Sequence, residues 1–296
     1  NHANQLNPNN QNYKGNRKQL NIKHSQNYLY NKEFVKIIIE KCNLNQNDVV
    51  IEIGPGKGII TEALARVSKS VLAIELDQQH AQTITQLFRQ NKKIKIIHMD
   101  FLKFPLPDEA YKIVSSIPYE LTSRIFKKVL EDKNAPEEVF FIMQKEAAEK
   151  YAGVKLPSIK HLFYAPLYDF SVIMEIKKQH FKPTPKVDSV LLHMKKKERC
   201  DFSYDDYQTF KDFICFFFKY KDIAMKKVFS YKQEKMIRKN LKINDSIFAE
   251  NYLNWKELFS VYKEFTSSEI KKKVDGQYKQ YLQENETKEK IYRTRR

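Results

Sequence analysis

Cysteine is scarce in this chain, and long apolar runs are missing. Only three cysteines occur among 296 residues, an odd number at wide spacings that fits neither a disulfide framework nor a CxxC metal site. The seven histidines are scattered without a His/Cys cluster, so no metal ion is expected. The chain has no apolar run of the roughly 18 residues that a membrane helix needs, and its asparagine-rich start does not read as a secretory signal. We therefore expect a soluble, cytoplasmic protein with no membrane segment.

Acidic residues are strongly outnumbered. Lys and Arg total 53 against 36 Asp and Glu, which gives a net charge of +17. An excess of this size favours a polyanionic partner, either nucleic acid or a membrane surface, and composition alone leaves both open. The length allows one large domain or two.

The order of apolar segments predicts an α/β domain over 22–195. Residues 1–21 hold eight asparagines and no acid, so this stretch is expected to be a disordered tail. Strands and helices then alternate, which is typical of a parallel sheet covered by helices on both faces. The expected strands are 48–54, 70–76, 94–99, 111–116 and 137–143, completed by 168–176 and 188–194.

The pattern changes after Met194. Apolar residues and lysines then recur at helical spacing, which predicts a small helical domain over 196–269 that binds RNA. The last stretch, 270–296, is basic and is expected to be a tail or a frayed helix. No internal repeat is present.

A glycine-rich loop, EIGPGKG at 52–58, follows the first strand. Gly54 and Gly56 let the backbone turn tightly and approach a ligand at a helix N-terminus. Ile59 stands where a dinucleotide fingerprint has its third glycine, and no GKS/T follows. This loop favours a nucleoside ligand without phosphates, above all S-adenosylmethionine.

Acidic residues close the next two strands. Glu75 lies where a carboxylate accepts hydrogen bonds from both ribose hydroxyls, and its alternative role is a solvated strand-end acid. Asp100 is placed to take an adenine amino group, with Phe101 covering the ring face. These strand ends converge on one edge of the predicted sheet, where ligands of open α/β sheets bind.

The fourth strand ends in VSSIPYELTS at 114–123, which is either an ordinary strand-to-helix turn or a clamp for a flat group. In the second reading, Ser116 and the Ile117 carbonyl accept hydrogen bonds from an exocyclic amine. The Tyr119 ring then stacks on the base that carries this amine.

Together these motifs resemble the ribosomal RNA adenine N6-dimethyltransferases, most closely the erythromycin-resistance (Erm) group acting on large-subunit RNA. The resemblance runs from HSQNYL at 24–29 to about Ser267, through EIGPGKG, SIPY, MQKEAAEK and FKPTPKVDS. It implies a Rossmann-like class I methyltransferase sheet followed by a small all-α domain. It also implies S-adenosylmethionine as cofactor, N6-(di)methylation of an adenine in 23S RNA, and resistance to macrolide–lincosamide–streptogramin antibiotics.

The resemblance also implies two sets of site residues. The cofactor set is Gln26, Asn27, Leu29, Gly54, Gly56, Glu75, Asp100, Phe101 and Ser116. The set that meets the target adenine is Ser116, Ile117, Tyr119 and Phe181, with Phe181 as the second stacking face. The implied partner is large-subunit RNA before assembly is complete, bound by a monomer.

One residue departs from the family pattern, which most often has asparagine where this chain has Ser116. A hydroxyl still accepts a hydrogen bond, although its reach is shorter. Two alternatives stay open. One is the related small-subunit adenine dimethyltransferase of ribosome biogenesis, and the other is a non-catalytic RNA-binding or transcription-factor member of the fold.

Overall fold

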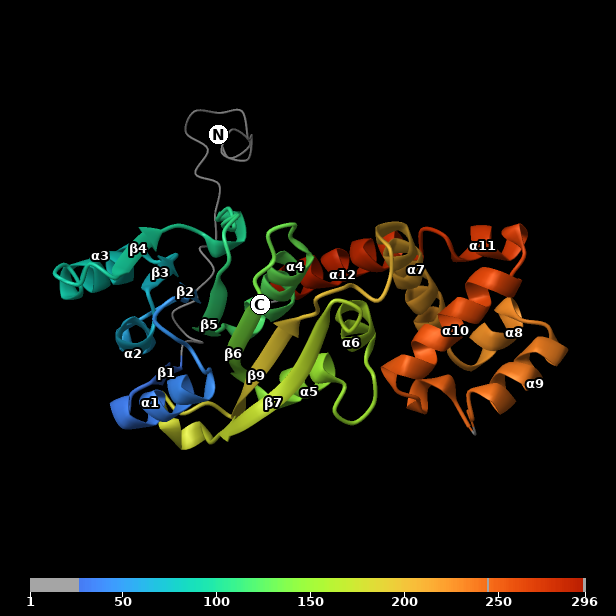
Figure 1. Ribbon diagram of the computed structural model, residues 1–296, viewed down its shortest axis with the longest axis horizontal. Helices are drawn as coiled ribbons and strands as arrows, with labels where there is room; N and C mark the ends of the chain where they lie inside the picture. Colours follow the sequence, from blue (N-terminus) through green and yellow to red (C-terminus); the bar gives the residue numbers. More distant parts are fainter. Residues whose placement is uncertain (1–26, 244, 295–296) are drawn as a thin grey trace, which may run out of the picture.

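The computed structural model describes residues 27–243 and 245–294, with side chains up to Asn285. The tail expected at 1–21 lies outside the described residues. A sheet with flanking helices forms one part of the molecule, and a group of helices forms the other (Figure 1).

The main sheet has seven strands in the order β4-β3-β2-β5-β6-β9-β7. The strands are β2 (Val49–Ile53), β3 (Ser70–Glu75), β4 (Ile94–His98), β5 (Lys112–Ser116), β6 (Glu138–Gln144), β7 (Tyr168–Ile176) and β9 (Ser189–Lys196). The first five in this order are parallel, whereas β9 runs antiparallel to both β6 and β7. The strands expected from the sequence are thus confirmed, and the sheet as a whole is mixed.

Both faces of the sheet are buried under helices. In β2, Val50 joins an apolar cluster with residues of α1 (Lys32–Lys41) and α2 (Ile59–Val67). Its neighbour Ile51 joins a second cluster with residues of α4 (Thr122–Glu131), α5 (Lys145–Ala152) and α6 (Ile159–Tyr164). Because adjacent strand residues point to opposite faces, the two clusters lie on opposite sides of the sheet. α3 (Gln78–Leu87) packs beside β3 and β4. The predicted α/β architecture, a sheet covered by helices on both faces, is confirmed.

A second, two-stranded sheet was not predicted. β1 (Tyr28–Leu29) pairs antiparallel with β8 (Phe181–Lys182), which places Leu29 opposite Phe181. Both side chains are buried, at 5% and 3% exposure, in the same apolar cluster as α1 and α2. This pairing joins Tyr28 and Leu29 to the start of the FKPTPKVDS segment.

The helical part is built around aromatic side chains. It contains α7 (Tyr204–Tyr220), α8 (Ala224–Val228), α9 (Tyr231–Asn240), α10 (Tyr252–Phe265), α11 (Ser268–Val274) and α12 (Gln277–Thr294). Trp255 is fully buried, with ring centroids 5.6 Å from Phe217 and 5.5 Å from Phe248. The larger apolar cluster of the sheet continues into these helices.

Of the two outcomes expected for 270–296, a tail or a frayed helix, the structure has a helix, since α11 and α12 continue to Thr294. The Tyr278 hydroxyl donates to Glu131 of α4 at 3.2 Å, and the Tyr278 N–H donates to Asp212 of α7 at 2.7 Å. The Tyr278 and Tyr281 rings both lie edge-on to Phe163 of α6. Two tyrosines three residues apart therefore give α12 an apolar stripe that contacts both parts of the molecule.

Among the described residues, none of the helices is both long and apolar enough to cross a membrane.

Candidate functional site

The polar strand ends predicted from the sequence meet at one edge of the sheet. β2 is followed outward by β3 and β4 on one side and by β5 and β6 on the other, so the chain reverses its direction of winding between β2 and β5. Ligands in open α/β sheets bind at the carboxyl ends of the strands beside such a switch point. Gly54 follows β2 there, and Ser116 ends β5.

The glycine loop leaves β2 with left-handed backbone at Gly54 and Gly56, where φ is +65° and +54°. A Cβ at Gly56 would overlap the ring of Tyr28, whereas a Cβ at Gly54 would meet nothing within 4 Å. The loop is therefore closed on the Tyr28 side and open at Gly54, which suits close approach of a ligand to the backbone.

Glu75 is buried at the end of β3, and both of its carboxylate oxygens are held by backbone. One oxygen accepts the Gly56 N–H at 3.2 Å, and the other accepts the Asp77 N–H at 2.9 Å. An ionised carboxylate has about four lone-pair sites, so two hydrogen bonds leave acceptor capacity for the hydroxyls of a ribose. The predicted ribose-binding acid is thus aimed at the glycine loop.

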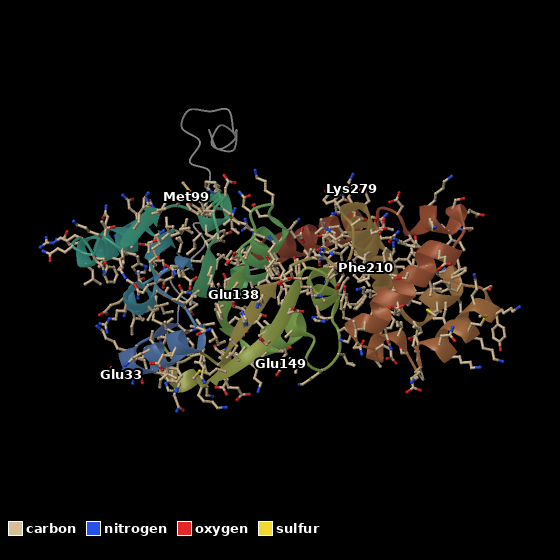
Figure 2. The ribbon with its side chains drawn as sticks, in the orientation of Figure 1. Glu33, Met99, Glu138, Glu149, Phe210 and Lys279 are labelled. Atoms are coloured by element: carbon tan, nitrogen blue, oxygen red, sulfur yellow. The ribbon has the colours of Figure 1, made fainter. Side chains whose placement is uncertain are left out.

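Asp100 lies beside Glu75, since His98 pairs with Glu75 and the Met99 N–H donates to the Glu75 carbonyl at 2.9 Å. Met99 is labelled in Figure 2. The Asp100 carboxylate accepts the Leu102 N–H at 2.9 Å, which leaves its other oxygen for a ligand. Phe101, predicted to cover the adenine ring, is buried at 6% exposure in the main core.

The turn after β5 presents Tyr119 to solvent. The Ser115 hydroxyl donates to the Ile53 carbonyl at 2.6 Å, which ties the ends of β5 and β2 together. Ser116 must then point to the opposite face of the strand. The Ile117 N–H donates to Ile142, and the Pro118 carbonyl accepts the Leu121 N–H at 3.1 Å, so the turn is held on both sides. The Tyr119 ring is 62% exposed.

Two further predicted residues, Leu29 and Phe181, belong to the small β1–β8 sheet. Asn27 is half-buried just before β1, while Gln26 lies outside the described residues. Leu29 and Phe181 are brought together, but inside the apolar cluster. Phe181 consequently presents no open ring face in this structure, because its side chain fills a core position.

Two residues at the site were missed by sequence reasoning. Tyr28 packs over Gly56, with the Lys57 ammonium 5.4 Å from its ring centroid. Burial, followed by the charges of Glu75 and Asp77, raises the pKa of the Tyr28 phenol. The sequence could have indicated a role for Tyr28, since this residue lies within the QNYL motif.

The other missed residue is Glu52, an acid in the apolar strand β2. It is 1% exposed and accepts the Thr61 hydroxyl at 2.6 Å. Burial raises the pKa of the Glu52 carboxyl to about 8, against the lowering effect of the Thr61 hydrogen bond. An acid directly before the glycine loop in an otherwise apolar strand was the available clue.

No cluster of three or more His, Cys, Asp or Glu side chains that could hold a metal ion occurs among the residues the structure describes. The groups at this edge of the sheet are instead backbone amides, two carboxylates, a hydroxyl and exposed aromatic surface. Such a set suits a nucleoside and a second flat base.

Known proteins are similar to this chain in sequence and in fold. A family model described as ribosomal RNA adenine dimethylase matches residues 17–267. An rRNA adenine N-6-methyltransferase of Bacillus licheniformis is 33% identical over 249 residues, which is 80% of this chain and 85% of the relative. A protein of the same name from Bacteroides fragilis is 29% identical over 241 residues, or 79% of this chain and 90% of the relative.

Two solved structures have the same fold. The 23S rRNA methyltransferase ErmE aligns with a TM-score of 0.74 at 22% identity, covering 80% of this chain and all of that chain. A dimethyladenosine transferase from Plasmodium falciparum aligns with a TM-score of 0.63 at 18% identity, covering 79% of this chain and 98% of that chain. The glycine loop, Glu75 and Asp100 fit the nucleoside part of the cofactor that methyltransferases of this fold use. The chain therefore belongs to the ribosomal RNA adenine dimethylase family of S-adenosylmethionine-dependent methyltransferases.

Proposed function

We propose that this enzyme methylates N6 of an adenine in large-subunit (23S) ribosomal RNA, and that the modification protects ribosomes from macrolide–lincosamide–streptogramin antibiotics. The observation that carries the proposal is the exposed Tyr119 ring on a turn that begins at Ser116, beside the glycine loop. The large-subunit assignment is supported by the Erm-like motifs. We further propose that it acts in the cytoplasm, as a monomer, on RNA that is not yet fully assembled.

The cofactor, when bound, supplies an electrophilic sulfonium methyl group. Glu75 binds its ribose, because the carboxylate is already oriented by the Gly56 and Asp77 amides. Asp100 takes the adenine amino group with the oxygen that is not engaged by Leu102. Gly54 allows the backbone to approach the ligand, since no atom lies within 4 Å of its missing Cβ.

The target adenine is held by the turn at 116–119. N6 is a poor nucleophile because its lone pair is delocalised into the ring. Hydrogen bonds from the amine to the Ser116 hydroxyl and the Ile117 carbonyl favour a pyramidal nitrogen whose lone pair points at the methyl group. Orientation of this kind contributes roughly 7 to 11 kcal/mol in favourable cases.

Stacking on Tyr119 offsets part of the free-energy cost of taking the adenine out of its base stack. Unstacking costs a few kcal/mol, and stacking on one aromatic side chain returns roughly 1 to 3 kcal/mol. The buried position of Phe181 leads us to assign the stacking to Tyr119 alone. No general base is required, because N6 becomes positively charged once it has bonded to the methyl group, and it then releases its proton to water.

Mapping of modified adenines tests the proposal directly. Ribosomal RNA from cells with and without the protein is compared for N6-methyladenine and N6-dimethyladenine, and macrolide susceptibility is measured in parallel. We expect a new modified adenine in the large-subunit RNA and reduced susceptibility. Drug-sensitive cells with unmodified large-subunit RNA would refute it.

A second candidate is small-subunit adenine dimethylation in ribosome biogenesis, favoured by the shared fold with a dimethyladenosine transferase. Transfer of labelled methyl groups to naked large-subunit RNA or to small-subunit particles separates the two enzymes. A third candidate, a non-catalytic RNA-binding member, is kept open by Ser116 and predicts labelling of neither.

A further inference from the structure

The outward face of α9 combines exposed lysines with exposed apolar side chains. Tyr231 is 83% exposed and Met236 is 56% exposed. Lys232, Lys235 and Lys239 are also exposed along this short helix. We call these five side chains the α9 face. An exposed ring among lysines is the combination that single-stranded nucleic acid binds, through phosphates and through base stacking.

The lysines of the α9 face carry uncompensated charge. None of the three forms an ion pair or a side-chain hydrogen bond with any residue in the described part of the chain. On neighbouring α10, by contrast, Lys256 pairs with Asp201 at 3.2 Å and Lys263 pairs with Asp206 at 2.6 Å. Lys256 and Lys263 of α10 are therefore neutralised by ion pairs, whereas the three lysines of the α9 face are not.

The one acidic residue of α9 is turned away from this face. The Glu234 side chain is 13% exposed and pairs with Arg238 at 2.9 Å. Residues 226–242 contain seven basic residues and this single acid. An anion that approaches the α9 face thus meets no exposed carboxylate from this segment.

The helix is also fixed in place before any ligand binds. Ser230 and Gln233 form a capping box at its N-terminus, with hydrogen bonds of 3.3 and 2.8 Å between them. Ile237 is buried on the opposite side. A prebuilt face loses little conformational entropy on binding.

We propose that the α9 face binds the ribosomal RNA substrate, with its lysines on phosphates and Tyr231 stacked on an unpaired base. The proposal rests on the proposed function, since it assumes that RNA is the substrate. α9 lies in the helical part, at the opposite end of the molecule from β4 and α3 (Figure 1). RNA held both there and at Tyr119 contacts the helical part as well as the sheet part of the molecule.

Salt dependence of RNA binding tests the lysines. The variant carries Lys232→Gln, Lys235→Gln and Lys239→Gln. The matched control carries Lys69→Gln, Lys92→Gln and Lys95→Gln, three exposed lysines near the amino ends of β3 and β4 that form no ion pair with a described residue. Both triple variants change the net charge equally.

Kd is measured for naked large-subunit and small-subunit transcripts over a series of KCl concentrations. Each lost phosphate contact lowers the slope of log Kd against log salt by roughly 0.7 to 0.9, so the α9 variant should lower it by about 2 to 3. The control should keep the wild-type slope, and cofactor affinity should be unchanged in both. Equal slopes in the α9 variant and the control would overturn the proposal.

Tyr231 is tested separately. Tyr231→Ala should weaken RNA binding by about tenfold with little change of slope, while Tyr231→Phe keeps the ring and should bind as the wild type does. Wild-type affinity in Tyr231→Ala would contradict the stacking role. The two proposals can fail separately. If the wild-type enzyme methylates neither RNA, but the α9 variant still lowers the slope of log Kd against log salt, the proposed function is wrong and RNA binding by the α9 face is supported.

Discussion

The Gly56 N–H donates to the Glu75 carboxylate at 3.2 Å, which joins the glycine loop to the end of β3. The second carboxylate oxygen accepts the Asp77 N–H at 2.9 Å, and the side chain is 4% exposed. Glu75 is consequently held in one orientation by backbone alone. The Glu75 carboxylate can therefore accept hydrogen bonds from a ligand without changing its orientation.

Replacing Glu75 should therefore weaken cofactor binding strongly. Glu75→Ala loses two charge-assisted hydrogen bonds to the ribose, each typically worth about 1.5 to 3 kcal/mol, so affinity should fall by about a hundredfold or more. Titration calorimetry measures this. Glu109→Ala, the same change at an exposed loop residue, is the control and should bind as the wild type does. Unchanged affinity in Glu75→Ala would remove the residue from the site.

Glycine substitutions separate backbone strain from steric conflict. Gly276→Ala introduces only backbone strain, because φ is +77° there and nothing lies within 4 Å of the added Cβ. It should lower the free energy of unfolding by about 1 to 2 kcal/mol. Gly56→Ala adds an overlap with the Tyr28 ring and should destabilise the protein further. Urea unfolding compares the two. Equal losses would mean that Tyr28 yields freely to the added methyl group.

Glu52 gives stability a defined pH dependence. Burial raises the pKa of this carboxyl to about 8 in the folded protein, whereas in the unfolded chain it titrates near its ordinary value of about 4.3. Between these values the folded state keeps a proton that the unfolded state loses, so stability falls as pH rises from about 5 to 8. The contribution is at most about 1.4 kcal/mol per pH unit.

Glu52→Gln removes this titration and keeps an oxygen for the Thr61 hydroxyl. The variant should gain stability over the wild type at pH 8 and differ little at pH 5. Unfolding free energies at both values, measured in urea, check the prediction. A wild-type pH slope in Glu52→Gln would show that another group causes it.

Tyr278 should matter for stability because its ring shields a buried ammonium. Lys211 is 3% exposed, and its Nζ lies 4.4 Å from the Tyr278 ring centroid and 4.6 Å from that of Tyr207. Burial lowers the pKa of Lys211. Tyr278→Ala removes this ring and the bond to Glu131, so we expect a loss of about 3 to 5 kcal/mol.

Thermal unfolding measures this loss. Tyr278→Phe keeps the ring and gives up only the hydroxyl bond, so about 1 kcal/mol should be lost. Lys279→Ala, on the exposed side of the same helix (Figure 2), is the control and should leave the midpoint unchanged. If the unfolding midpoint of Tyr278→Ala is as high as that of the control, the contacts of Tyr278 with the rest of the molecule add nothing to its stability.

Local patterns were enough to predict the main sheet and most of its strand ends. Short runs of β-branched apolar residues at 49–53 and 112–116 indicate buried strands without tertiary information. Glu75 and Asp100 follow directly from strand ends. The antiparallel entry of β9 could not be read in this way. Its orientation depends on the connection at 177–188, which returns the chain from β7 to β9 and contains β8, and buried strands of either direction have similar sequences.

Features that depend on contacts between distant parts of the chain could not be predicted from local patterns. β1 and β8 have two residues each and are about 150 positions apart, so neither carries a strand pattern of its own. Phe181 and Phe101 were expected as ring faces for the ligands, but motif position does not show whether an aromatic side chain fills the core. The stretch that forms α12 was expected as a tail or a frayed helix, because its charge obscures the Tyr278–Tyr281 stripe that packs it against the molecule.

The central claim is that Ser116 and Tyr119 position the target adenine after RNA has bound. Ser116→Ala removes one acceptor and leaves the Ile117 carbonyl, so methyl transfer should slow by about one to two powers of ten, equivalent to roughly 1.4 to 2.7 kcal/mol. Ser116→Asn restores the commoner family residue and should preserve or raise the rate. Tyr119→Ala should cost more than Ser116→Ala, and Tyr119→Phe should be tolerated.

Single-turnover methyl transfer at saturating RNA and cofactor is the most direct test, because it excludes differences in binding. The account predicts slowed transfer in Ser116→Ala and Tyr119→Ala with RNA affinity nearly unchanged. Wild-type rates in both variants would contradict it and would make the stretch from Ser116 to Tyr119 an ordinary turn between β5 and α4.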